Sequence, residues 1–277
     1  MTVRDYLKRR ACEALLGSVR WACVLVFLWL LAWQAVDLGD RVSFHLLGRQ
    51  LGWGGAGEWV FHPAALGATA AALGVRLLLL APLQAGAVTW FDGLMARRDR
   101  PLGTLFWPYG NRVWLRSLGV RLYAGAATGA VALLPLAGLG SAVWLLRHRL
   151  AALSPEHRAL AAALTGVAAA LWLLAAAAYA KRFSMAVLLL GPDYGCTAAE
   201  AIALSAECTR GYRWRLVWLD LTLLPWLASC LLVLPAVYAL PYCAACRVGY
   251  SRYLYRRMLR KRQRQKGRDR DGTEHRV

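Results

Sequence analysis

The sequence has few acidic residues and none of the short motifs on which many enzymes and metal sites are built. Its 277 residues include 15 Asp and Glu against 34 Lys and Arg, a formal net charge of +19. Its histidines stand at unrelated spacings without an HExxH pair, no GxSxG turn surrounds a serine, and no Walker-type glycine loop precedes a lysine. We therefore predict that the protein is not an enzyme and holds no cofactor or metal.

The cysteines also lack the pattern of a disulfide framework. Seven are present, an odd number, scattered through apolar or basic segments. Cys243 and Cys246 form a single CxxC, whereas a structural zinc site needs four ligands and no second CxxC or HxxxH pair accompanies them. We interpret the cysteines as small apolar side chains.

Long apolar runs dominate what is present. Hydrophobic residues make up 59% of the sequence, and several runs approach the roughly 20 residues that an α-helix needs to cross a bilayer. The run over residues 216–246 contains three prolines and is too long for one span, so we divide it near residues 233–235; one broken span is the alternative. The predicted fold class is all-α, a polytopic membrane bundle of about six transmembrane helices with short interfacial helices. The predicted spans are residues 19–36, 63–91, 118–145, 160–180, 215–232 and 234–255.

The positions of the basic residues predict the orientation of this bundle. Lys and Arg gather in residues 4–10, 97–121 and 181–215 and from residue 247 onward, beside the apolar runs, as at the cytoplasmic borders of membrane proteins. This distribution favours membrane topology over nucleic-acid binding. We predict a multi-pass protein of the cytoplasmic membrane, with both termini in the cytoplasm and basic surfaces that face anionic lipid headgroups. Residues 37–62 are predicted to be an external loop, and the side on which the basic residues 146–158 lie stays open.

One segment outside the spans has the pattern of a surface helix. Thr197 and Glu200 have the spacing of a capping box, which predicts a helix start, and Gly211 predicts the stop. Trp214 and Arg215 then stand where the next apolar run enters the membrane, a border typical of aromatic and basic side chains. We predict an interfacial helix over residues 197–210 on the cytoplasmic side.

The same region carries a family resemblance. It rests on the segments KRFSMAVLLLGPD (181–193), EAIALSAECTRGYRWRL (200–216), LDL (219–221) and LPY (240–242), and on Tyr179, Tyr250 and Tyr253. Together they resemble domain-of-unknown-function family 975, a group of bacterial multi-spanning membrane proteins, over about residues 76–257. That family usually has Pro where Val187 stands, His where Tyr212 stands, and a short Pro-Gly turn in place of residues 139–160. The resemblance implies a six-span integral membrane fold, and the family has no established activity.

Charges inside the predicted spans are the most informative functional signal, because a charge in hydrocarbon is costly and usually finds a partner or a wet cavity. Arg76 and Asp220 are the candidates. A direct pair between them would need a long reach, since they lie at different depths along their spans. Arg121 and Arg182 lie at depths closer to that of Asp220, and we predict that one of them is its partner.

Two main functional hypotheses follow. The first is a non-enzymatic scaffold, or a partner of other membrane proteins, in the bacterial cell envelope. The alternative is a small-solute transporter or channel with Asp220 and Arg76 lining a cavity, and a cavity that reaches Asp220 would favour it. A lipid-modifying enzyme is a third reading, for which the sequence offers no nucleophile–base pair or metal set.

We expect residues 1–257 to form one membrane domain and the basic tail, residues 258–277, to be disordered in the cytoplasm.

Overall fold

A computed structural model of the chain describes residues 3–51, 63–110, 113–145, 154–229 and 233–274. The described residues form helices and turns and contain no strand, which confirms the all-α prediction for this part of the chain. The elements are α1 (Val3–Leu16), α2 (Val19–Leu51), α3 (Pro63–Met95), η2 (Leu102–Leu105), α4 (Trp107–Gly110), α5 (Val113–Leu145), α7 (Pro155–Ala180), η3 (Lys181–Phe183), α8 (Ala186–Leu189), α9 (Ala198–Cys208), α10 (Arg213–Ser229) and α11 (Val233–Glu274).

Four stretches among the described helices are long and apolar enough to cross a membrane. They are Val19–Ser43, Gly67–Met95, Val113–Leu145 and Pro155–Leu189. These stretches overlap the first four predicted spans. The apolar run after residue 215 divides into α10 and α11, which lie where the last two spans are predicted. By length and composition, the described structure therefore has four candidate membrane helices rather than six.

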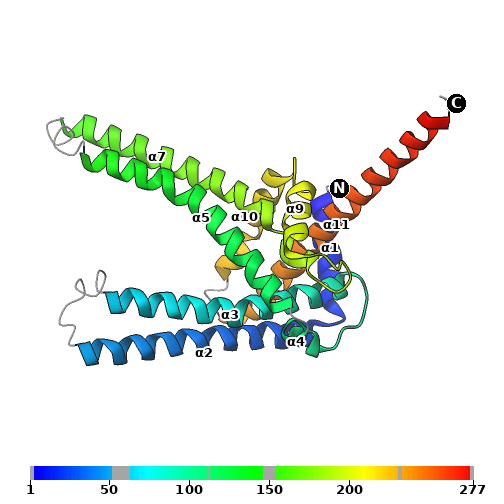
Figure 1. Ribbon diagram of the computed structural model, residues 1–277, viewed down its shortest axis with the longest axis horizontal. Helices are drawn as coiled ribbons and strands as arrows, with labels where there is room; N and C mark the ends of the chain where they lie inside the picture. Colours follow the sequence, from blue (N-terminus) through cyan, green and yellow to red (C-terminus); the bar gives the residue numbers. More distant parts are fainter. Residues whose placement is uncertain (1–2, 52–62, 111–112, 146–153, 230–232, 275–277) are drawn as a thin grey trace.

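The long described helices form three hairpins that meet at one end of the molecule (Figure 1). α2 lies beside α3 and α5 beside α7, and these two hairpins diverge as they extend toward the same side. α10 contacts α11, with the Trp226 ring 5.3 Å from the ring of Tyr242. α1 and α9 lie where the hairpins meet, and the C-terminal half of α11 extends from there, away from the loop ends of the α2–α3 and α5–α7 hairpins (Figure 1).

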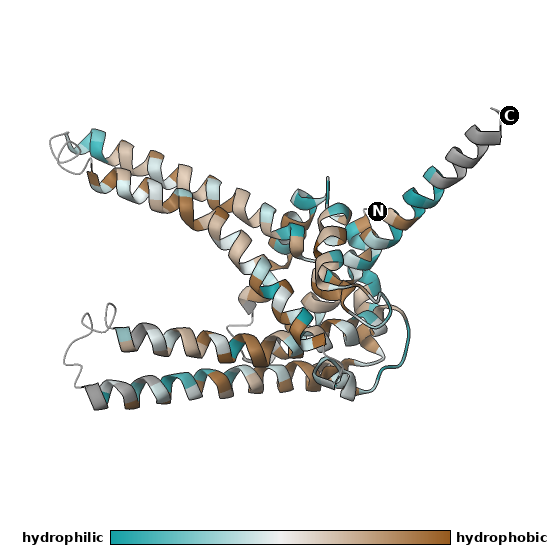
Figure 2. Ribbon diagram, in the orientation of Figure 1, coloured by the Kyte–Doolittle hydropathy of each residue, from teal (hydrophilic) through white to brown (hydrophobic). Residues whose placement is uncertain are grey.

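Buried side chains gather where the hairpins meet. One cluster joins α1, α2, α3, α10 and α11 and includes Leu25, Leu223 and Leu254; a second joins α5 to α8 and α9 and includes Val120 and Leu189. By contrast, none of the most apolar stretch of α5 is buried. The diverging part of the α5–α7 hairpin is mostly apolar along its length (Figure 2). Such an exposed apolar surface is stable against lipid or another apolar partner, not against water.

α2 is longer than the first predicted span. Residues 37–51, predicted to lie in an external loop, continue the helix to Leu51, and residues 52–62 lie outside the described residues. The helix continues because Asp37 pairs with Arg41 one turn later at 2.8 Å, and because Asp37 and Asp40 both bind Arg76 of α3. The acidic residues that suggested a loop therefore hold two helices together.

α11 also extends beyond its predicted end. The predicted disordered tail is helical as far as Glu274. Residues 258–266 contain Met, Leu, Arg, Lys and Gln, all good helix formers, and no Gly or Pro. Arg262 is further held by Glu207 of α9 at 2.5 Å. α7 likewise begins before its predicted start, at Pro155, while residues 146–153 lie outside the described residues.

Candidate functional site

The predicted capping box is present at the start of α9. The Thr197 hydroxyl accepts a hydrogen bond from the Glu200 backbone N–H at 3.4 Å, and a Glu200 carboxylate oxygen accepts one from the Thr197 N–H at 2.8 Å. The second hydrogen bond lowers the pKa of the Glu200 carboxyl. Gly211 has φ of 80°, a left-handed conformation that suits glycine and ends the turn before α10. The predicted helix is confirmed, and it fixes where α10 begins.

The two residues predicted to mark the membrane border lie in the first turn of α10. Trp214 is exposed, and the Arg215 guanidinium lies 5.2 Å from the centre of the Tyr212 ring. This stacking orients the cation without neutralising it. Their position at a lipid–water boundary stays a prediction.

Arg76 is held between α2 and α3. Its Nε donates to Asp40 at 2.5 Å and its Nη2 to Asp37 at 2.6 Å. The guanidinium also lies 5.9 Å from the centre of the Trp33 ring. Two carboxylates thus compensate one cation, and Arg76 is not among the residues that line the cavity beside Asp220. We assign Arg76 to the packing of the α2–α3 hairpin.

Asp220 connects α10 to two other elements. One carboxylate oxygen accepts a hydrogen bond from Lys181 Nζ in η3, and the other accepts from Arg247 Nε in α11 at 2.9 Å. The predicted partners, Arg121 and Arg182, form no ion pair with Asp220. That part of the sequence interpretation is therefore corrected: Lys181 and Arg247 hold the carboxylate.

The local backbone explains why Lys181 replaces the predicted Arg182. The chain leaves α7 through the 3₁₀ helix η3, in which successive side chains point about 120° apart. Lys181 faces α10, whereas the Arg182 guanidinium lies 6.0 Å from the centres of the Tyr179 and Phe183 rings. Arg247 was not considered as a partner because it was counted among the basic residues that follow the run over residues 216–246. Its place as the first cation after that run, within the predicted span 234–255, is the sequence feature that could have identified it.

A cavity of about 610 Å³ lies between the three hairpins and reaches Asp220. Its lining contains four charged side chains, those of Arg121, Lys181, Asp220 and Arg247. The polar lining is completed by Gln84, Thr128, Ser184 and Ser251, and apolar side chains come from α2, α3, α10 and α11. The volume falls within the range of about 300–1,000 Å³ typical of small-molecule sites.

Arg121 gives this cavity an excess of positive charge. It lies on α5, and its Nε is buried without a hydrogen-bond partner among the described residues. The cavity therefore holds three cations against one carboxylate. The Nε atoms of Arg4, Arg182 and Arg213 are likewise buried without a partner among the described residues, so what distinguishes Arg121 is its place in this cavity.

A second carboxylate, which is fully buried, was missed by the sequence interpretation because it lies just beyond the predicted span 63–91. Asp92 lies in α3 and is 2% exposed. It accepts hydrogen bonds from Arg252 Nη1 at 2.8 Å and from the Tyr194 hydroxyl at 3.3 Å. Burial raises the pKa of the Tyr194 hydroxyl, so this group stays a neutral donor. The three residues tie α3 to α11 and to the turn before α9.

Long apolar helices joined by partly buried ion pairs are typical of a helical membrane protein. Residues 132–262 match the family described as Protein of unknown function (DUF975), which supports the resemblance over this part of the chain. The predicted resemblance is thereby confirmed, over a region that starts later than residue 76. It includes Lys181, Asp220 and Arg247 but not Arg121. No curated protein and no solved structure matches the chain.

Proposed function

We propose that this chain is a six-span integral membrane protein that binds a small anionic solute in the cavity beside Asp220, as a transporter or channel would. In this proposal α10 and the first half of α11 are the fifth and sixth spans. The membrane is the cytoplasmic membrane of a bacterium, with both termini on the cytoplasmic side. Lys and Arg concentrated near the end that holds the termini support this orientation.

The observation that carries the solute-binding proposal is the unpartnered Arg121 Nε in a cavity that already holds Lys181 and Arg247. Asp220 is shared by those two cations and so has no capacity left to neutralise Arg121. An anion between Arg121 and the polar lining would remove the excess charge. In a site of low dielectric, such charge-assisted hydrogen bonds are stronger than the same bonds in water.

The test is to replace Arg121 by an apolar side chain of similar length. Arg121→Met removes an uncompensated charge, so it should raise the thermal midpoint of the anion-free protein in neutral detergent by about 2–4 °C. Phosphate, sulfate and acetate, each at matched ionic strength, are then compared as stabilising anions. Any anion that stabilises the original protein should no longer do so in Arg121→Met.

Arg116→Met is the matched control, because Arg116 lies on the same helix and is exposed outside the cavity. It should change neither the thermal midpoint nor the response to anions. If Arg121→Met lowers the thermal midpoint, Arg121 stabilises the protein as it stands, and the anion-binding proposal is wrong.

A scaffold function is the second candidate, and the exposed apolar surface of the α5–α7 hairpin favours it. Leu134 is 71% exposed and Leu171 62% exposed, on helices whose apolar stretches are almost entirely unburied. A partner membrane protein could cover these side chains as well as lipid could. Co-purification of a stoichiometric partner that is lost when Leu134 and Leu171 are replaced by Trp would favour this function over solute binding.

The six-span topology has its own test. Cysteines introduced at Glu156, at the start of α7, and at Gln265, in the C-terminal part of α11, should lie on opposite sides of the membrane. In intact cells an impermeant thiol reagent should label position 156 above the level of the original chain and leave position 265 unlabelled. Labelling at both positions, or at 265 alone, contradicts the proposed topology.

A further inference from the structure

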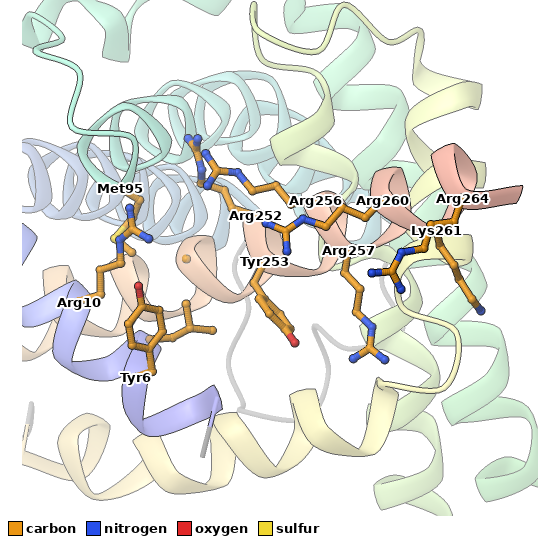
Figure 3. Close-up of a pocket in the computed structure, with 12 residues that line it drawn as sticks. Tyr6, Arg10, Met95, Arg252, Tyr253, Arg256, Arg257, Arg260, Lys261 and Arg264 are labelled. Atoms are coloured by element: carbon orange, nitrogen blue, oxygen red, sulfur yellow. The ribbon is translucent and has the colours of Figure 1, made fainter. Parts of the chain in front are cut away.

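A second hollow lies on the surface, between α1 and α11, and it is strongly basic. This groove has a volume of about 550 Å³. It is lined by Tyr6, Leu7, Arg10, Met95, Gly249, Arg252, Tyr253, Arg256, Arg257, Arg260, Lys261 and Arg264, with no acidic side chain among them. Figure 3 shows Arg10 and Tyr6 on α1 facing the row of basic side chains on α11. The spacing of residues 252, 256 and 260 explains the row, since residues four apart share one face of a helix.

Most of these cations have no compensating partner. Arg252 is the exception, because it binds the buried Asp92. The other six, from Arg10 to Arg264, form no ion pair with any described residue. Arg262, which points away from the groove, is paired with Glu207 at 2.5 Å. Like charges in one groove repel each other, so a ligand that carries several negative charges would relieve the repulsion.

The floor of the groove is apolar and lies at the end of a candidate membrane helix. Met95, the last residue of the stretch Gly67–Met95, is buried there beside Leu7. Gly249 allows this close approach, since a Cβ at that position would lie 2.7 Å from the Met95 methyl group. The groove thus combines an apolar floor at a membrane border with a cationic wall that extends away from it.

We propose that the groove binds the headgroup of an anionic phospholipid from the surrounding membrane. Its phosphates contact Arg10, Arg256 and Arg260, and its glycerol and first acyl carbons lie over Leu7 and Met95. Basic pockets beside membrane helices are suited to headgroups that carry two phosphates, such as that of cardiolipin. A free polyanion would gain nothing from the apolar floor, which is why the geometry points to a lipid. This site is separate from the cavity beside Asp220 and does not depend on the solute proposed there.

The experiment titrates the full-length protein in neutral detergent with cardiolipin, phosphatidylglycerol and phosphatidylcholine, and counts bound lipids by native mass spectrometry. Affinity should fall in that order, with cardiolipin at least about tenfold tighter than phosphatidylcholine. Replacing two groove cations, Arg10→Gln with Arg260→Gln, should weaken cardiolipin binding at least about tenfold. A second groove pair, Arg256→Gln with Lys261→Gln, should reproduce this loss.

The matched control is Arg9→Gln with Arg262→Gln, which removes the same charge from the same two helices outside the groove. It should change cardiolipin affinity less than twofold. Equal weakening by groove and control variants means diffuse charge attraction and overturns the proposal, as does equal binding of phosphatidylcholine. Two competitors distinguish other sources of phosphate. If pyrophosphate or short single-stranded DNA binds more tightly than cardiolipin at the same ionic strength, the groove is not a lipid site.

Discussion

Two charged clusters lie among the apolar helices, and they differ in how their charges balance. Between α2 and α3, one guanidinium, that of Arg76, meets the carboxylates of Asp37 and Asp40. Beside α10, one carboxylate, that of Asp220, faces three cations, and the Nε of Arg121 has no partner among the described residues. Arg41 also pairs with Asp37, so the first cluster has two cations and two carboxylates and no net charge. The second has a surplus of positive charge.

The two clusters also differ in what they connect. The Arg76 cluster joins neighbouring helices of a single hairpin, so its loss should loosen that hairpin alone. The Asp220 cluster joins the end of α7 to α10 and α11, and its cavity is also lined by α2, α3 and α5. Its loss should therefore affect how the hairpins are held together. The following substitutions test this difference.

The largest effect is expected for Asp220→Asn. It leaves Lys181 and Arg247 without their counter-charge in a cavity where Arg121 already has none, and removing one partner of an ion pair inside a protein is strongly destabilising. Because the Asp220 side chain is 24% exposed, we expect a loss of about 2–3 kcal/mol, below the full cost of breaking a deeply buried pair. Thermal unfolding in neutral detergent measures it.

Removing a matching cation tests whether charge balance is the cause. Asp220→Asn combined with Lys181→Gln should recover part of the lost stability, because one unpaired cation is removed. Asp220→Asn combined with Arg182→Gln should recover none, since Arg182 does not contact the carboxylate. If Asp220→Asn leaves stability unchanged but abolishes solute flux in vesicles, the carboxylate acts on the solute and does not hold the hairpins.

A smaller effect is expected for Arg76→Gln. It removes the cation that α3 supplies to Asp37 and Asp40, but Asp37 keeps Arg41 at 2.8 Å. We therefore expect the free energy of unfolding to fall by about 1–2 kcal/mol. Arg41→Gln is the control. Its side chain is 79% exposed, and loss of an exposed pair should cost less than about 0.5 kcal/mol. Equal effects of the two substitutions would show that the Arg76 cluster is not distinguished by its burial.

The sequence was sufficient to predict the features that depend on local pattern. The apolar runs predicted the four candidate membrane helices, and the spacing of Thr197 and Glu200 predicted the start of α9. The division of the last apolar run into two helices was also predicted, close to where α10 ends and α11 begins. Each of these follows from hydrophobicity or hydrogen bonding over a few turns of chain.

The partners of the charged residues could not be predicted in the same way. Depth along a span placed Arg182 as near to Asp220 as Lys181, and only the direction of the 3₁₀ turn at η3 separates them. The same limit applies to Asp92, which looked like a loop residue because its partner Arg252 is distant in sequence. Which side chains meet depends on helix rotation and on the packing of separate hairpins, and neither is encoded in local periodicity.

The capping box formed by Thr197 and Glu200 lies outside both charged clusters and serves as a reference for comparing them. At the start of α9, Thr197→Ala removes the hydroxyl that accepts the Glu200 N–H, and it should cost about 1 kcal/mol of local helix stability. Hydrogen exchange in the first turn of α9 should accelerate accordingly, while exchange near Asp220 should not change. Acceleration at both places would mean that α9 and the Asp220 cluster unfold as one unit.

The smallest effect concerns pH and the Glu200 carboxylate itself. The Thr197 backbone N–H donates to Glu200 and lowers its folded-state pKa below the ordinary value of 4.5. The stability that this carboxylate adds is therefore fully present above that ordinary value, and it is lost as the pH falls through the folded-state pKa. Protection of the first turn of α9, corrected for intrinsic exchange rates, should decrease in that range, and Glu200→Gln should remove the decrease. Glu13→Gln, which alters an exposed carboxyl on α1, should leave it intact. If protection in Glu200→Gln decreases with pH as much as in the original chain, another acid group causes the decrease. The Glu200 carboxylate then adds no pH-dependent stability to the start of α9.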